Sequence, residues 1–136
     1  MSEVTEPQPP APERVLIVED DPATRSGLAE LVQAWGFLTD EASDGEAAMA
    51  KVTTFRPAII VSDLVMPRMG GLDLLRALQD QLTDLTFILL TAQGTVDSAV
   101  EAIKDGAYDY LSKPVDPQRL QILLQKAVER QETLRE

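Results

Sequence analysis

The stretch IIVSDLVMPRMGG, from Ile59 to Gly71, decides the fold of this chain. Its first four residues are apolar except for Ser62, and the run ends on Asp63, before a loop rich in Met, Pro and Gly. A short apolar run bounded by turn residues is typical of a strand buried on both faces of a parallel sheet. The carboxylate at its end is either a charge that meets water or a reactive group held at the rim of a sheet. The ends of the other strands decide between the two interpretations.

Composition limits what the chain can do. Its 136 residues are enough for one domain with a substantial core. It has no cysteine and no histidine, which excludes a disulfide framework, thiolate chemistry, histidine-ligated zinc and a phosphohistidine within the chain. The formal net charge of −11 argues against direct nucleic-acid binding and favours a divalent cation or a basic partner. No apolar run approaches the roughly 20 residues that span a bilayer, and no signal peptide begins the chain, so we expect a cytoplasmic protein away from membranes.

Five expected strands alternate with five expected helices. The strands are VLIV (15–18), FLTDEA (37–42), AIIV (58–61), FILL (87–90) and YDYL (108–111). The second strand is the most polar, which places it near an edge with Asp40 and Glu41 facing solvent. This alternation predicts an α/β fold, with helices on both faces of a parallel sheet, because parallel strands need crossover connections. In such sheets ligands bind outside the carboxyl ends of the strands.

Capping signals mark the starts of several helices. Asp21 followed by Pro22 is typical of an N-cap with proline at the first helical position. Ser43 and Glu46 have the spacing of a capping box, which predicts a helix N-cap at Ser43. Thr95 can cap the fourth helix. The cap explains Asp21 fully, so we interpret this aspartate as structural.

Polar side chains follow four of the five strands. They are Glu19, Asp20 and Asp21 after the first strand, Asp63 after the third, Thr91 after the fourth and Lys113 after the fifth. Such grouping is costly, because two like charges about 4 Å apart repel by roughly 4 kcal/mol at an effective dielectric near 20. A fold tolerates this where a cation neutralises the carboxylates, and Mg²⁺ takes oxygen ligands of this kind. Asp63 can then act as a nucleophile that forms an aspartyl phosphate, with the lysine offsetting phosphoryl charge.

The motifs VLIVEDD, ASDGEAA, VSDLVMPRMGGLDLL, LLTA and GAYDYLSKP, taken in this order, resemble the receiver domain of bacterial two-component response regulators. The resemblance covers about residues 14–130. It implies the flavodoxin-like (βα)5 fold, a doubly wound five-stranded parallel sheet with strand order 2-1-3-4-5. The stretch TAQGTVDSAVEAIKDGAYDYLSKPVD (91–116) is most similar to receivers of NtrC-type activators of sigma-54-dependent transcription.

The resemblance implies a metal and phosphoryl site. Carried over residue by residue, it makes Asp63 the phosphoacceptor and Asp20 a direct Mg²⁺ ligand. Glu19 would act on the metal largely through water, and the backbone carbonyl of Val65 would complete the protein's share of the metal shell. Mn²⁺ is an alternative ion. Many members of the family carry Asp at the Glu19 position, so the longer Glu side chain is a departure at the metal contact.

The resemblance also implies a switch. Thr91 would bind the phosphoryl group and shift toward it, and Tyr110 would point inward or outward according to state. Lys113 would pair with Asp63 or its phosphate, and the Lys113–Pro114 peptide would be cis.

The function implied is that of a two-component response regulator receiver. A sensor histidine kinase would pass a phosphoryl group to Asp63 with Mg²⁺, and the change would control an output domain or a downstream protein, typically in transcription regulation. The chain would be a phospho-accepting regulatory domain that assists its own phosphorylation and dephosphorylation, not an enzyme. A phosphorylation-dependent homodimer would use the fourth helix, fifth strand and fifth helix. Residues 1–13 are predicted to be a disordered Pro-rich tail, and residues 131–136 to extend the last helix as a linker to an output domain.

Two other functions do not fit the residues at the strand ends, and a third remains as the alternative. A phosphatase of the haloacid dehalogenase type needs a second aspartate two residues after its nucleophile, where this chain has Ala23 or Val65. A flavodoxin-type flavin module needs a Ser/Thr/Gly-rich phosphate loop after the first strand, where this chain has EDDPATR. A degenerate receiver that acts only as a phosphorylation-independent interaction module is the remaining alternative.

Overall fold

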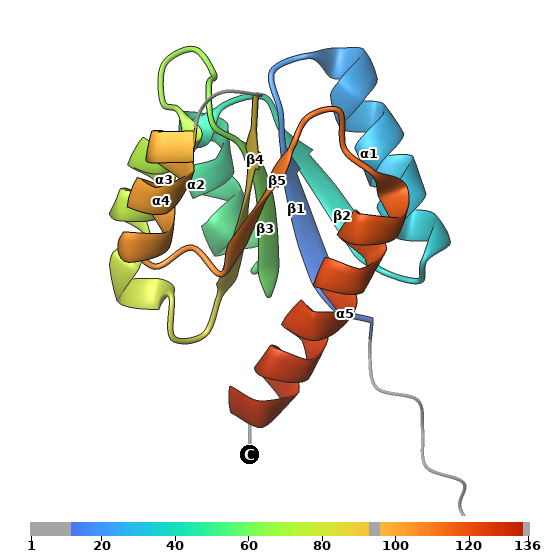
Figure 1. The fold of residues 1–136 in the computed structure, drawn as a ribbon. Helices are drawn as coiled ribbons and strands as arrows, with labels where there is room; N and C mark the ends of the chain where they lie inside the picture. The colour runs from blue at the N-terminus through green and yellow to red at the C-terminus, as the bar shows by residue number, and fades with distance from the viewer. Residues whose placement is uncertain (1–11, 93–95, 135–136) are drawn as a thin grey trace, which may run out of the picture.

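A single parallel sheet organises the molecule in the computed structural model, which describes residues 12–92 and 96–134 (Figure 1). The strands are β1 (Arg14–Val18), β2 (Leu38–Ala42), β3 (Ile59–Asp63), β4 (Thr86–Thr91) and β5 (Asp109–Ser112). The helices are α1 (Pro22–Ala34), α2 (Gly45–Thr54), α3 (Gly71–Ala77), α4 (Val96–Lys104) and α5 (Pro117–Leu134), with a short 3₁₀ turn, η1 (Gln79–Gln81). The strand order is β2-β1-β3-β4-β5 and every pairing is parallel, which confirms the predicted fold. The predicted tail over residues 1–11, the cap at Thr95 and the last two residues of the predicted extension lie outside the described residues.

The sheet separates two apolar cores. Helices α1 and α5 cover one face, and α2, α3 and α4 cover the other (Figure 1). Alternate residues of β1 supply both cores, with Val15 and Ile17 packed in the first and Leu16 and Val18 in the second, all with no exposed surface. This burial on both faces is why the strand forms a continuous apolar run in the sequence.

Helices α1 and α2 begin on aspartate caps. Asp21 is the N-cap of α1, and its side chain accepts the amide hydrogen bond of Thr24 at 2.9 Å, as predicted. Helix α2 begins one residue later than the capping-box pattern predicts. Its N-cap is Asp44, which accepts from the amide of Ala47 at 2.9 Å, so the prediction of a cap at Ser43 is wrong. Aspartate caps helices as well as serine does, and here the same carboxylate also accepts a 2.7 Å hydrogen bond from Arg68.

Strand β2 lies at an edge of the sheet, as its polarity predicts. The prediction that its two carboxylates simply face solvent is wrong. Asp40 accepts a 2.8 Å hydrogen bond from Lys51 of α2, and Glu41 accepts a 3.2 Å hydrogen bond from Arg25 of α1. Helices approach this strand from both faces, so each side chain becomes half-buried beside a basic residue.

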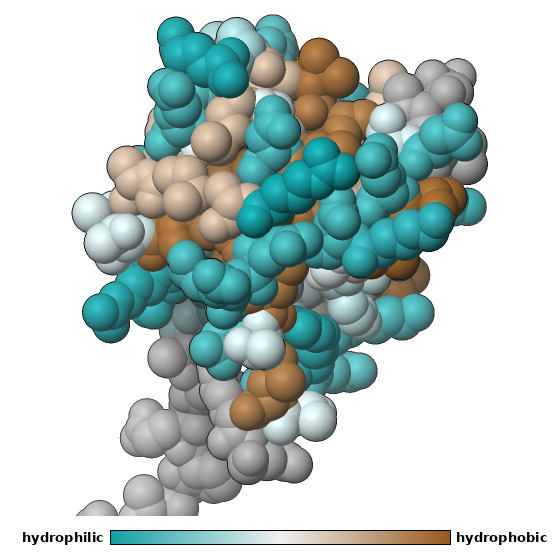
Figure 2. Space-filling view, turned by 90° about the vertical axis from the view of Figure 1, so that its left-hand side faces the viewer, coloured by the Kyte–Doolittle hydropathy of each residue, from teal (hydrophilic) through white to brown (hydrophobic). Residues whose placement is uncertain are grey.

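The side of the molecule that carries α2, α3 and α4 is largely hydrophilic, with separate apolar patches (Figure 2). Part of this polarity comes from Arg76 of α3, which pairs with Glu101 and Asp105 at 3.1 and 2.8 Å. Among the described residues, no helix is both long and apolar enough to cross a membrane.

Candidate functional site

The polar residues that follow the strands come together at one edge of the sheet. Glu19 directly follows β1, Asp63 and Thr91 are the last residues of β3 and β4, and Lys113 directly follows β5. The parallel register of β3 and β4 sets Asp63 one position before Thr91 along this edge. The carboxyl edge of the sheet is therefore the candidate site, as expected for an open α/β sheet.

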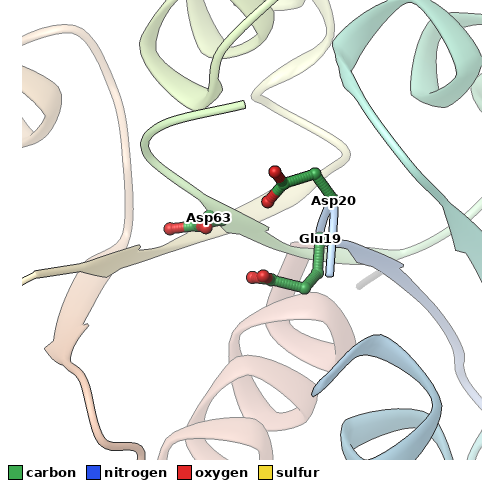
Figure 3. Close-up of side chains that lie close together, drawn as sticks. All are labelled: Glu19, Asp20 and Asp63. Atoms are coloured by element: carbon green, nitrogen blue, oxygen red, sulfur yellow. The ribbon is translucent and has the colours of Figure 1, made fainter. Parts of the chain in front are cut away.

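Three carboxylates form a cluster at this edge. Oxygen atoms of Glu19, Asp20 and Asp63 all lie within 4.8 Å of one another. Figure 3 shows that the first two come from the end of β1 and the third from the end of β3, and that all three project to the same side. Asp20 is exposed, whereas Glu19 and Asp63 are only 2% and 8% exposed. An oxygen-only donor set with one open side fits a hard divalent cation such as Mg²⁺, which keeps several waters or phosphate oxygens.

Lys113 neutralises part of this negative charge. Its ammonium lies 2.9 Å from Asp63 Oδ2 and 2.9 Å from Glu19 Oε2. The family resemblance implies the contact with Asp63 but not the contact with Glu19. The peptide between Lys113 and Pro114 is cis, as predicted.

The pKa values at the site follow from this arrangement. Burial raises the pKa of Glu19, the nearby charge of Asp63 adds to the rise, and the hydrogen bond from Lys113 opposes it. Burial acts to lower the pKa of Lys113, but its bonds to Asp63 and Glu19 outweigh this effect and raise that pKa above its ordinary value of 10.5. Lys113 therefore carries a full positive charge at neutral pH.

Both oxygens of the Asp63 carboxylate are held in place. Oδ1 accepts a 2.9 Å hydrogen bond from the amide of Leu64, and Oδ2 accepts the bond from Lys113. The Leu64 amide also donates to the carbonyl of Leu90 at 2.9 Å, which ties this turn to β4. A carboxylate fixed in this way is pre-oriented for attack on an incoming electrophile.

Arg25 supports the acidic turn after β1. Its Nη1 donates to the Glu19 carbonyl at 2.9 Å while its Nε donates to Glu41 of β2. The sequence did not single out this residue, because nothing local distinguishes it from a surface arginine on the first turns of a helix. Only the pairing of β1 with β2 brings its two acceptors together.

Three further predicted site residues lie in β4, in β5 and in the loop after β3. Thr91 is 1% exposed, and its carbonyl accepts a 2.7 Å hydrogen bond from the Lys113 amide. Tyr110 is half-buried on β5 and packs against the core on the α2–α3–α4 face. The side chain of Val65 is 71% exposed in the loop after Asp63. Their roles in phosphoryl binding, switching and metal binding stay predictions.

A known protein family matches most of the chain. The family described as "Response regulator receiver domain" matches residues 15–125. A solved structure, the response regulator receiver domain protein from Clostridium thermocellum, superposes with a TM-score of 0.85 at 28% identity, covering 90% of this chain and 98% of that one.

Two curated relatives are regulatory proteins of larger size. The chain is 34% identical over 123 residues to the regulatory protein AtoC of Escherichia coli and 35% identical over 116 residues to the C4-dicarboxylate transport transcriptional regulatory protein DctD of Pseudomonas aeruginosa. These alignments cover 90% and 85% of this chain but only 27% and 25% of the relatives. The expected similarity to NtrC-type regulators is confirmed by these matches, and the chain spans about a quarter of their length.

Proposed function

Because the chain belongs to the response regulator receiver domain family, we propose that it accepts a phosphoryl group on Asp63 and switches conformation to control an output domain or a partner protein. The observation that carries this proposal is the position of Asp63. Its carboxylate is oriented by Leu64, paired with Lys113 and grouped with Glu19 and Asp20 at the carboxyl edge of the sheet. A carboxylate that only met water would not require this surrounding set of charges.

The proposed reaction is phosphoryl transfer from a phosphohistidine of a sensor kinase. An oxygen of Asp63 attacks phosphorus, the new P–O bond forms as the P–N bond breaks, and the imidazole leaves with the bonding pair and takes up a proton. Lys113 and the Thr91 hydroxyl stabilise negative charge on the phosphoryl oxygens.

The carboxylate cluster fits a Mg²⁺ ion in this proposal. Asp20, Asp63 and the Val65 carbonyl would hold it directly, with Glu19 acting largely through water, and Mn²⁺ could take its place. When bound, the ion would neutralise phosphoryl charge that the acidic cluster otherwise repels.

Phosphorylation would then change a surface. The added charge draws Thr91 toward the phosphoryl group, and Tyr110 repacks into the space that this leaves. The surface of α4, β5 and α5 changes with it, and this surface includes the exposed apolar residues Val100 and Ile122. It would serve an output domain, a downstream protein or a second copy of the chain.

We expect the same site to assist hydrolysis, in which water attacks phosphorus and the P–O bond to Asp63 breaks. The chain would therefore regulate its own phosphorylation without turning over a substrate. A small phosphate ester incubated with the protein should give no multiple turnover. A constitutive interaction module is less well supported, because it would not need the paired and oriented Asp63.

The direct test is phosphorylation by acetyl phosphate with Mg²⁺. The wild type should gain the mass of one phosphoryl group as an acid-stable, hydroxylamine-labile adduct, and Asp63→Asn should gain none. Asp73→Asn, which alters an exposed aspartate in the first turn of α3, is the matched control and should react like the wild type. An unmodified wild type, or an adduct that survives in Asp63→Asn, would contradict the proposal.

A further inference from the structure

The loop between β3 and α3, residues 64–70, is fastened to the start of α2 by an ion pair. Nε and Nη2 of Arg68 lie 2.7 and 2.6 Å from Oδ2 of Asp44. The Arg68 side chain is 62% exposed, but that of Asp44 is only 3% exposed. Arg68 also has a φ of 66°, a left-handed conformation that few non-glycine residues adopt. The loop therefore has an unusual backbone conformation at the residue that makes this contact.

Backbone contacts strengthen the same junction. The Gly45 amide donates to the Met69 carbonyl at 2.8 Å, and a Cβ at Gly45 would overlap the Met69 side chain. Asp44 serves both segments at once, because its Oδ1 caps α2 through the Ala47 amide while its Oδ2 holds Arg68. The position of the loop is therefore set by the N-terminus of α2.

The opposite end of the loop is tied to the phosphoacceptor. The Leu64 amide donates to Asp63 Oδ1, and the Gly71 amide donates to the Leu64 carbonyl at 2.9 Å. Val65 lies between this end and Arg68. Since its side chain is 71% exposed, packing of that side chain does little to hold the local backbone. Met66, on the other side of this carbonyl, is buried in the core, so the direction of the Val65 carbonyl depends on the packing of Met66 and on how the two ends of the loop are anchored.

We propose that the Arg68–Asp44 pair is a positioning device that holds the Val65 carbonyl toward the cation site. This inference rests on the proposed function, in which that carbonyl is a Mg²⁺ ligand. Arg68 and Asp44 touch neither the cation nor the phosphoryl group in this proposal. They act through the loop, as residues that support metal ligands commonly do.

If Arg68 and Asp44 acted on the cation only through their charges, the two substitutions would have opposite effects on cation binding. Removing the positive charge of Arg68 from the neighbourhood of an acidic site would strengthen cation binding, and removing the negative charge of Asp44 would weaken it. If the pair positions the loop, both substitutions should weaken cation binding. Measuring both variants therefore distinguishes the positioning effect from a simple charge effect.

The test measures Mg²⁺ dissociation constants from backbone amide shifts in NMR titrations. The variants are Arg68→Asn, which tolerates a left-handed φ, and Asp44→Asn, which keeps a helix N-cap. Each should raise the dissociation constant about tenfold, the lower end of the range for residues that support metal ligands. The double variant should bind no more weakly than either single variant, and Arg68→Lys should be intermediate. Arg76→Asn, which breaks an ion pair between α3 and α4, is the matched control and should bind like the wild type.

A second readout needs no metal. In metal-free protein, amide hydrogen exchange at Gly45 and Gly71, which donate to the loop carbonyls of Met69 and Leu64, should be faster in both variants than in the wild type, because the loop opens more often. This measurement tests the loop even if one variant loses overall stability, since exchange elsewhere in the sheet reports that loss separately.

The outcomes distinguish this inference from the proposed function. If the wild type binds Mg²⁺ and is phosphorylated while both variants bind Mg²⁺ equally well, the positioning role alone is overturned. Tighter binding in Arg68→Asn with weaker binding in Asp44→Asn also overturns it, in favour of simple charge. A wild type that binds no Mg²⁺ at millimolar concentration overturns both.

Discussion

Asp21 adjoins the acidic cluster, yet its carboxylate is engaged by a helix. It accepts a 2.6 Å hydrogen bond from the Thr24 hydroxyl and a 2.9 Å hydrogen bond from the Thr24 amide. The hydroxyl bond, followed by the amide bond, lowers the pKa of Asp21 below its ordinary value of 3.8. Four consecutive positions in the chain, 18 to 21, thus end a strand, build a site and begin a helix.

This lowered pKa makes a prediction about stability and pH. A carboxyl group whose pKa is lower in the folded state stabilises that state above its unfolded pKa and loses this effect as pH falls through its folded pKa. We expect Asp21→Ala to lower the melting temperature by a constant amount at neutral and weakly acidic pH, and by less and less below pH 3.8. Thermal unfolding in a chelator measures this without interference from metal.

Asp21→Asn is the control, because asparagine caps helices as well as aspartate does without an ionisable group. At neutral pH it should melt close to the wild type. A deficit in Asp21→Ala that does not change with pH would contradict the assigned cap.

At the scale of elements, the start of α3 depends on a close backbone approach to β3. A Cβ at Gly71 would overlap the Asp63 carbonyl oxygen and come within 2.9 Å of Leu89 Cδ1. Backbone cannot move aside as a flexible side chain can. The glycine is therefore required at the point where the chain leaves Asp63.

We predict that Gly71→Ala lowers the free energy of unfolding by roughly 1–3 kcal/mol, the usual cost of overpacking. Gly27→Ala is the matched control, because Gly27 lies within α1 with nothing within 4 Å of an added Cβ. Alanine there should stabilise the protein by roughly 0.5–1 kcal/mol, since glycine is a poor helix former. Urea unfolding measures both, and equal effects of the two substitutions would refute the close contact.

At the scale of the whole molecule, the far end of the sheet is joined to the last turns of α5. Gln131 is 2% exposed and donates to the Ala58 carbonyl at 3.1 Å and to Thr86 Oγ1 at 2.7 Å. Arg130 donates to Thr86 Oγ1 at 2.6 Å and to the Leu82 carbonyl at 3.0 Å. Helix α5 is therefore anchored at the end of the sheet opposite the acidic site.

Gln131→Ala should lower the free energy of unfolding by roughly 1–3 kcal/mol, because it leaves buried acceptors with fewer donors. Gln125→Ala changes an exposed glutamine in the same helix and should have little effect. Chemical denaturation of both variants tests the difference. If the two variants are equally stable, the buried network contributes nothing to the anchoring of α5.

Local patterns in the sequence determined the order of the elements and the residues that follow each strand. An apolar run such as VLIV or AIIV consists of neighbouring residues, so it can be recognised in the sequence. The carboxyl ends of parallel strands also lie at the same edge of their sheet. For this reason the sequence alone assigns Glu19, Asp63 and Lys113 to one site.

Only the tertiary structure decided how those groups pair. Lys113 contacts Glu19 across 94 positions of sequence, and Arg68 contacts Asp44 across 24. The second contact involves Asp44, the N-cap of α2, where the sequence predicted a cap at Ser43. Such pairings depend on strand register and on where a loop touches a helix, and these are set by packing of the whole chain rather than by the spacing of residues along it.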